Sequence, residues 1–309
     1  MDSVGGDGSR RLTRRQLLTR TGFLGAAIAL GPTLLGSNRA GAGPLDRLLG
    51  ADPGLLNTAR RILGQITIDT YRGLVVFVAP GNDALSRHQG AFTDRPGALD
   101  ARADSFVSDA LDDFIPLPDA VLRPVVRALA TSLDDAGVPV APSLLGGLLD
   151  TALLDELGEA VDQLLANDQT IPLSGLIALL LNVEATAVDP TSVIGPFNSP
   201  FARLSSAEKA AVFRNLEDPR PDLVALIDAN FPQPLRASVS GILRFTAGAL
   251  IEFSAFATFS EYGTFDHATR TVTARPVGWD LSSYLPGRTT PPDGSDDLLG
   301  YYQGRRSVG

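Results

Sequence analysis

The chain has 309 residues, and its 26 basic and 35 acidic side chains give a formal net charge of −9 at pH 7. An acidic surface repels phosphate backbones, so we do not expect nucleic-acid binding. The chain contains no cysteine, which excludes disulfide bonds, iron–sulfur ligation and thiol catalysis by its own residues.

Residues 1–42 have the order of a secretory signal. Basic residues come first, an apolar run over 23–35 follows, and Ala40-Gly41-Ala42 is a small-x-small triplet suited to a signal peptidase. The apolar run is shorter than the roughly 20 residues that span a bilayer. We expect cleavage after Ala42. Six basic and two acidic residues lie in the leader, so the remaining 267 residues would have a net charge of −13.

The leader also resembles a twin-arginine signal, because an arginine pair precedes an apolar pair: Arg14, Arg15, Leu17 and Leu18. Such signals are addresses read by a receptor. They predict that the chain folds first and then leaves through the twin-arginine translocase, to the extracellular space or the cell envelope. The alternatives are an ordinary export signal and an uncleaved leader that tethers the chain to the membrane.

The first half of the mature chain shows mixed periodicity. Apolar residues over 54–70 follow one helical face, whereas the run 73–79 is rich in β-branched residues and predicts a strand. A turn at 80–83 follows. Residues 99–114 have one apolar stripe opposite four aspartates, which predicts an amphipathic helix that ends before Pro116 and Pro118.

Further helices are expected over 119–133 and 142–166, and another begins at Pro172 with a run over 176–181 that is apolar on all sides. A helix of that kind belongs in the core. The Pro/Gly/Ser/Asn-rich connector 191–201 is the best candidate for a hinge.

A capping box at Ser205 and Glu208 predicts the start of the next helix. The last long helix runs from Pro234 to about Ser260. It is apolar enough to suggest a membrane span, but Arg244 and Glu252 argue against one.

Three small residues recur every seven positions in this last helix and predict a groove for another helix, from the same chain or from a partner: Gly241, Gly248 and Ala255.

From Tyr262 the chain is rich in proline, glycine and aromatic residues, and 271–274 suggests a short strand. The predicted fold is therefore mainly α, an irregular helical bundle with a β-rich segment near 73–79 and a mostly non-helical aromatic tail. After the signal at 1–42, the expected parts are a lobe at 43–200 and a lobe at 201–309, or one continuous domain.

The sequence contains no nucleophile elbow, phosphate-binding loop, zinc-helix motif or dinucleotide fingerprint. His88 beside Ser86, and His267 beside Asp266, are the least poor candidates for a base and a metal ligand, but loop packing accounts for both. Lys209 is the only lysine, so Schiff-base chemistry would depend on it.

A cluster of aspartates could form a calcium site or a solvated acidic face, and we favour the solvated face because the spacing lacks a calcium loop. Its members would be Asp109, Asp112, Asp113, Asp134 and Asp135. We expect no catalytic residue, no cofactor and no metal of the chain's own. Arg244 and Glu252 are interpreted as a satisfied ion pair or as part of an interface.

Several parts of the chain together resemble the gluconate 2-dehydrogenase subunit 3 type of protein. These parts are the leader, the segments LSSAEKAAVFRNLE and GILRFTAGALIEFSAFATFSEYG, and the tail elements RPVGWDLSSYLPG and DDLLGYYQGRR. The chain departs from that type by a long insertion before the capped helix. The resemblance implies a small exported accessory subunit whose partner is a flavin-dependent dehydrogenase of the glucose–methanol–choline class. FAD would then belong to the partner.

We therefore expect a non-catalytic accessory or escort subunit. Its partner interface would use the last long helix and the aromatic tail: Gly241, Arg244, Gly248, Glu252, Ala255, Trp279, Tyr284, Tyr301 and Tyr302. The alternatives are a secreted or membrane-tethered cell-envelope protein with a structural or binding role, and a stand-alone exported enzyme. The tail could instead pack on its own domain.

Overall fold

The computed structural model describes residues 53–114, 128, 172–231, 233 and 235–284. Within these residues the chain is mostly helical and has a single two-stranded sheet. The predicted mainly α fold is therefore confirmed. The helices expected over 119–133 and 142–166 lie outside the described residues, apart from Ala128, which is helical.

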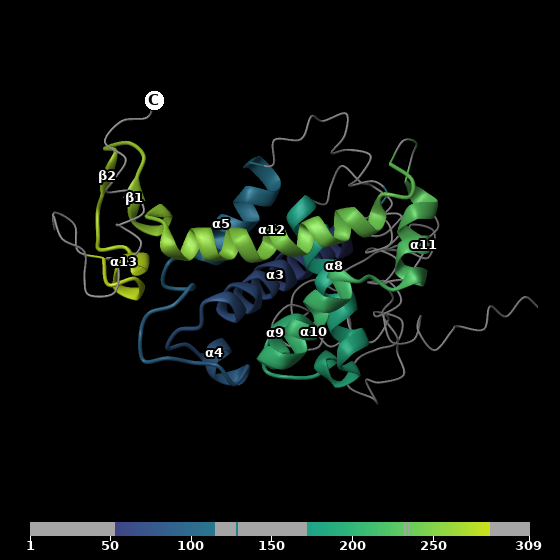
Figure 1. Ribbon diagram of the computed structural model, residues 1–309, viewed down its shortest axis with the longest axis horizontal. Coiled ribbons are helices and arrows are strands. Elements are labelled where there is room, and N and C mark those ends of the chain that lie inside the picture. Colours follow the sequence, from purple (N-terminus) through teal and green to yellow (C-terminus); the bar gives the residue numbers. More distant parts are fainter. Residues whose placement is uncertain (1–52, 115–127, 129–171, 232, 234, 285–309) are drawn as a thin grey trace, which may run out of the picture.

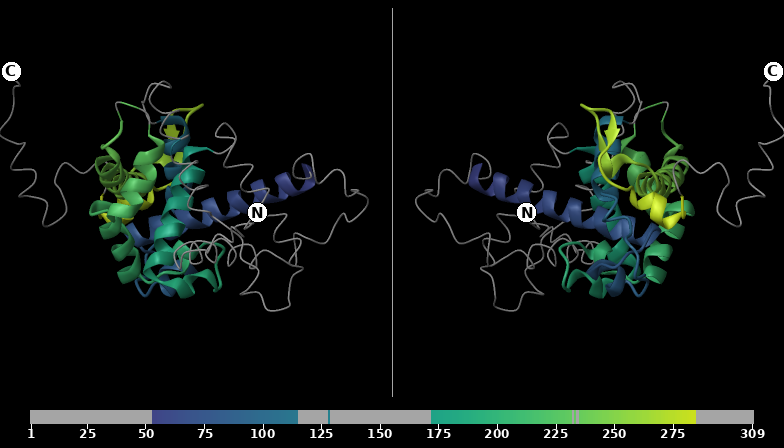
Figure 2. Two further views of the ribbon diagram at one scale, coloured as in Figure 1. Left: turned by 90° about the vertical axis from the view of Figure 1, so that its right-hand side faces the viewer. Right: turned by 90° about the vertical axis from the view of Figure 1, so that its left-hand side faces the viewer.

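Two long helices form the frame of the molecule. α3 (Pro53–Val78) has 26 residues, and α12 (Val239–Phe259) has 21 residues and passes in front of α3 (Figure 1). Figure 2 shows that the first half of α3 extends away from the other described helices. The helix expected over 54–70 thus continues for two more turns, and α12 begins five residues later than predicted.

The strand predicted near 73–79 is wrong, because these residues form the last turns of α3. Gly73 and the three residues after it are all buried, and Leu74, Val75 and Val76 are fully so. A run that is buried on every side shows no alternation that separates a strand from a helix. Tertiary burial here outweighs the strand preference of valine.

α3 is followed by α4 (Ala84–His88), which Asp83 caps by accepting a hydrogen bond from the backbone N–H of Ser86. α5 (Ala103–Asp109) then continues into a π-helical turn, η2 (Ala110–Phe114). The helix predicted over 99–114 is confirmed from residue 103 onward. Its apolar stripe is buried as expected, at Ala103, Val107, Ala110 and Leu111.

α8 (Leu173–Val188) is the central helix of the described core. All ten residues from 173 to 182 are buried, which confirms the prediction from its all-round apolar run. The Oδ1 and Oδ2 atoms of Asp112 accept hydrogen bonds from the backbone N–H and the hydroxyl of Ser174 at 2.8 and 2.7 Å. These bonds satisfy the start of α8 from a neighbouring element.

The predicted hinge segment 191–201 contains parts of two short helices, η4 (Pro190–Val193) and α9 (Pro200–Arg203). It is tied to α3, because Asp69 accepts hydrogen bonds from the backbone N–H groups of Asn198 and Ser199 at 2.8 and 2.9 Å. These contacts do not favour a hinge.

α10 (Ser206–Glu217) begins with the predicted capping box, which is confirmed. The Ser205 hydroxyl accepts from the backbone N–H of Glu208, and the Glu208 carboxylate accepts from the backbone N–H of Ser205 at 2.8 Å. Such reciprocal bonds satisfy two otherwise unpaired donors. α11 (Pro221–Asn230) follows and leads toward α12.

The described part of the tail folds back on the end of α12. It comprises η5 (Tyr262–Thr264), the antiparallel strands β1 (Phe265–Asp266) and β2 (Thr271–Val272), and the short helix α13 (Val277–Leu281). The strand expected at 271–274 is thus confirmed in part. Gly278 lies so close to α12 that a Cβ there would approach the Phe259 backbone to 2.6 Å.

One hydrophobic cluster joins elements from both sides of residue 200. It includes Leu74 on α3, Leu181 on α8, Leu216 on α10 and Leu250 on α12. The division into lobes at 43–200 and 201–309 stays a prediction, and the shared core is what one continuous domain would have.

Candidate docking surface

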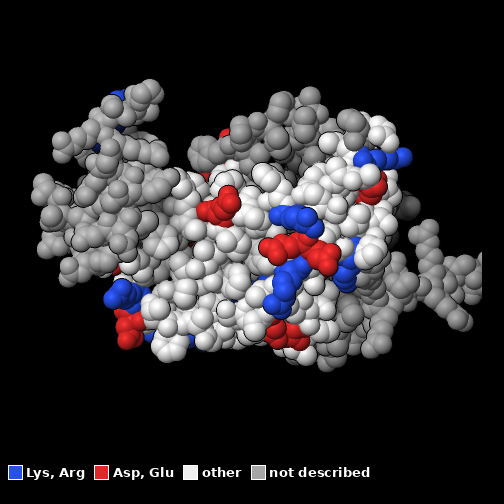
Figure 3. Space-filling view, viewed as in Figure 1, with Lys and Arg blue, Asp and Glu red and all other residues white. Residues whose placement is uncertain are grey.

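α12 has one buried face and one exposed face. Leu243, Ala247, Leu250 and Ala257 are buried against the core, whereas the opposite side is open to solvent (Figure 3). We call the exposed side the outer face of α12 and define it by Gly241, Arg244, Phe245, Gly248, Glu252 and Ala255, of which Ala255 is half-buried and the rest are exposed.

The small residues predicted to form a helix-packing groove therefore face outward. A Cβ added at Gly241 or at Gly248 would meet no atom within 4 Å. No described helix of the chain fills this groove. Beside it lies Phe245, whose 74% exposure is the highest among the exposed large apolar side chains of the described residues. An apolar ring that is left so open on a groove of small residues is typical of a contact surface.

The two charges of α12 also lie on the outer face. Arg244 donates from Nε to the backbone carbonyl of Glu217 at 3.0 Å, and Glu252 forms no ion pair with any described residue. The intramolecular Arg244–Glu252 ion pair considered from the sequence is therefore not formed. Both side chains keep charge available for another molecule.

Aromatic side chains gather where the tail meets the end of α12. Trp279 packs edge-on to Tyr284 at 5.3 Å between ring centroids, and its Nε1 donates to Glu261 Oε1 at 3.2 Å. Phe259, Phe265 and Tyr284 are 53%, 36% and 50% exposed. We call Phe259, Phe265, Trp279 and Tyr284 the aromatic end. The described tail thus packs partly on its own domain and still presents aromatic surface.

α12 is also long and apolar enough to cross a membrane by length and composition, with a mean hydropathy of 1.4, and 33% of it is buried. Burial of one face against the core argues for a surface helix of a folded protein. The exposed Arg244 and Glu252 would be costly in hydrocarbon.

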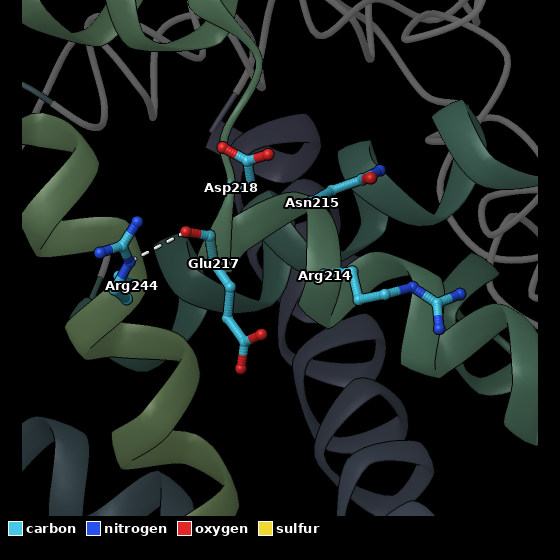
Figure 4. Close-up of a pocket in the computed structure, with 5 residues that line it drawn as sticks. All are labelled: Arg214, Asn215, Glu217, Asp218 and Arg244. Carbon is cyan, nitrogen blue, oxygen red and sulfur yellow. Dashed lines mark hydrogen bonds between the residues drawn. The ribbon is translucent and has the colours of Figure 1, made fainter.

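A shallow hollow of about 610 Å³ lies at the junction of α10 and α12, lined by Arg214, Asn215, Glu217, Asp218 and Arg244. Figure 3 shows basic and acidic side chains close together on this face of the molecule. Figure 4 shows that the side chains point in different directions rather than toward a common point. The hollow therefore brings no set of these side chains together around one point.

The histidines form no reactive pair in the described structure. His88 Nε2 lies 2.8 Å from the backbone carbonyl oxygen of Arg203, and its ring packs edge-on to Phe197. The Ser86 hydroxyl donates to Asp83 instead. His267 packs on Phe265 at the surface. Among the described residues, no group of three or more His, Asp or Glu side chains could hold a metal ion.

Two of the acidic residues considered for calcium serve other contacts, and Asp113 is exposed. Asp109 accepts a hydrogen bond from the Tyr262 hydroxyl at 2.8 Å, and Asp112 binds Ser174. Asp134 and Asp135 lie outside the described residues. So do several other predicted residues: Arg14, Arg15, Leu17, Leu18, Ala40, Ala42, Tyr301 and Tyr302.

A buried polar cluster joins α3, the end of α4 and α10, and the sequence did not reveal it. Lys209 Nζ donates to the Gly73 carbonyl at 3.0 Å and to Gln89 Oε1 at 2.8 Å. Burial lowers the pKa of Lys209 to about 7, although Asp83 and Asp69 oppose this. Burial also raises the pKa of Asp69.

The cluster is structural, because its hydrogen bonds go to backbone and amide groups of the chain itself. A signal for it exists in the sequence: Lys209 lies three, four and seven residues before Val212, Phe213 and Leu216, on the buried stripe of α10.

Comparison of the chain with protein-family models, with curated proteins and with solved structures found no match.

Proposed function

We propose that the chain is a non-catalytic, exported accessory subunit that docks on a larger enzyme through the aromatic end. The observation that carries the proposal is the aromatic surface that the tail builds at the end of α12. Aromatic residues are enriched at the centres of protein interfaces, where large and fairly rigid rings bury much area.

Two features support the aromatic end as the contact site. Phe259, Phe265 and Tyr284 are at least one-third exposed. Their backbone is held in place, because Gly278 packs directly on Phe259 and the Tyr284 backbone N–H donates to the Trp279 carbonyl at 2.8 Å. A rigid surface loses less entropy when it binds.

The partner that we propose is a flavin-dependent dehydrogenase of the glucose–methanol–choline class. This part rests on the resemblance of the leader, the capped helix, α12 and the tail to gluconate 2-dehydrogenase subunit 3 proteins. FAD belongs to the partner, and the accessory chain has no chemical step of its own.

A folded-export signal gives this pairing a physical reason. A flavoenzyme binds FAD only in its folded form, so it must fold before it crosses the membrane. A chain with a twin-arginine signal could carry the address for both proteins, and docking would keep them together during export.

The test is affinity purification of the tagged, exported chain, with measurement of bound flavin and identification of the co-purified protein. The wild type is expected to bring down a flavoprotein in near-stoichiometric amount. Phe259→Gln is expected to lose most of it. Phe92→Gln is the matched control, because Phe92 is a similarly exposed phenylalanine, at 58%, in the loop after α4. Purification of the wild type alone, or equal losses in both variants, would reject the docking role.

A membrane-facing role in the cell envelope is the second candidate, and the apolar composition of α12 is the observation that favours it. Flotation of the chain with vesicles separates the two. Binding that Phe259→Gln abolishes would support the membrane role, and absence of binding would exclude it.

A further inference from the structure

We propose that the outer face of α12 binds the same face of a second copy of the chain, as an antiparallel pair with its two-fold axis at Gly248. This goes beyond the proposed function, because it concerns the middle of α12 and not the aromatic end, and it requires no other protein.

The residues of the outer face are arranged closely around Gly248. With 100° per residue, the other five residues of the outer face all lie within about 60° of Gly248 around the helix axis. Gly241 and Ala255 lie seven residues before and after it. The open space over both glycines would let a second helix approach closely along a groove whose small residues are spaced symmetrically about Gly248.

The outer face is complementary in charge to the same face of a second copy. Arg244 lies four residues before Gly248 and Glu252 lies four residues after it. When two copies pair antiparallel about Gly248, Arg244 of each copy lies opposite Glu252 of the other. The two-fold symmetry therefore makes two ion pairs from one Arg and one Glu.

A parallel pair would place Arg244 opposite Arg244 and Glu252 opposite Glu252, which is unfavourable. The charges thus select the antiparallel arrangement. They also explain why two charged residues occupy an otherwise apolar and small-residue surface.

The same two-fold axis also creates an apolar contact. Phe245 lies three residues before Gly248 and Ile251 three residues after it. The ring of Phe245, at 74% exposure, would therefore cover the half-buried Ile251 of the second copy. Pairing would remove from water the most exposed of these apolar side chains.

The test is the mass of the purified full-length chain in solution, measured by sedimentation equilibrium without any partner protein. The wild type is expected to be a dimer. Arg244→Glu alone and Glu252→Arg alone are each expected to weaken the dimer by about tenfold or more, because each change creates two repulsive pairs. The double variant is expected to restore it.

Two matched glycine variants locate the interface. Gly248→Leu is expected to give a monomer that keeps its thermal stability, since its own chain leaves the space open. Gly64→Leu should leave the dimer unchanged, because Gly64 is an exposed glycine on α3 with nothing within 4 Å of an added Cβ. Loss of the dimer in both variants would contradict the location.

Cross-linking gives a second readout, because the chain has no cysteine. Gly248→Cys is expected to form a disulfide-linked dimer under mild oxidation, since the two copies of residue 248 meet at the axis. Gly64→Cys should not.

A monomeric wild type, a dimer that persists in Gly248→Leu, or a double charge variant that stays dissociated would each overturn the proposal. Binding of a monomeric wild type to lipid vesicles would assign the face to a membrane and would overturn it as well. The outcome is independent of flavoprotein co-purification, so failure of either proposal leaves the other standing.

Discussion

Lys209 shows how far a single residue can depart from its usual role. It is the only lysine of the chain, it is fully buried, and it ties α10 to the last turns of α3. Its ammonium group has lost most of its hydration, which favours the neutral form and lowers its pKa. Two acceptors at hydrogen-bond distance hold it there.

The stability of the protein should therefore depend on pH through this one group. In the folded state the pKa of Lys209 is about 7, against 10.5 for an unperturbed lysine. Between these values the unfolded chain binds more protons, so stability rises as the pH rises. Relative to Lys209→Met, we expect the unfolding free energy of the wild type to increase by up to about 1.4 kcal/mol per pH unit between roughly pH 7.5 and 9.5.

Urea unfolding of both proteins at several pH values measures this difference. Lys209→Met is the control for the wild type, because every other titrating group is present in both proteins. A difference that is constant with pH would show that Lys209 keeps its proton in the folded state.

At the scale of an element, two of the three glycines of α3 lie in different surroundings. Gly64 is exposed with open space around it, whereas a Cβ at Gly73 would approach Ala202 Cα on α9 to 2.8 Å. Alanine favours a helix over glycine by about 1 kcal/mol. We expect Gly64→Ala to stabilise the protein by up to that amount and Gly73→Ala to destabilise it, because the α9 backbone must move.

Thermal unfolding of the two variants checks this pair, in which each serves as the control for the other. Equal stabilisation by both changes would mean that α3 and α9 do not pack as closely as described.

The sequence predicted those elements whose signals are local. The capping box at Ser205 and Glu208, the all-round apolar helix after Pro172 and the long helix α12 were found because each depends on residues within a few turns. The segment 73–79 was assigned wrongly, since its state depends on burial by α9 and other elements distant in the sequence. The direction in which Gly241 and Gly248 face follows only from which side of α12 packs on the core.

At the scale of the whole molecule, the described helices form a body that presents an aromatic end and an open helix face, and residues 1–42 are expected to direct export of the folded chain. The leader predicts the route. Replacement of Arg14 and Arg15 by lysine should abolish export and leave the folded chain in the cytosol, because the receptor reads the arginine pair. Fractionation of cells measures the exported fraction, and an unchanged fraction would contradict the twin-arginine route.

The central claim is that the aromatic end contacts a flavoprotein, and site-specific photo-cross-linking tests it most directly. A photoreactive residue in place of Phe259 should form a cross-link in intact cells to one protein that contains flavin, while the same residue in place of Phe92 should not. The account predicts this difference between the two positions. Cross-links from position 259 only to lipid, only to unrelated proteins, or equal to those from position 92 would contradict it.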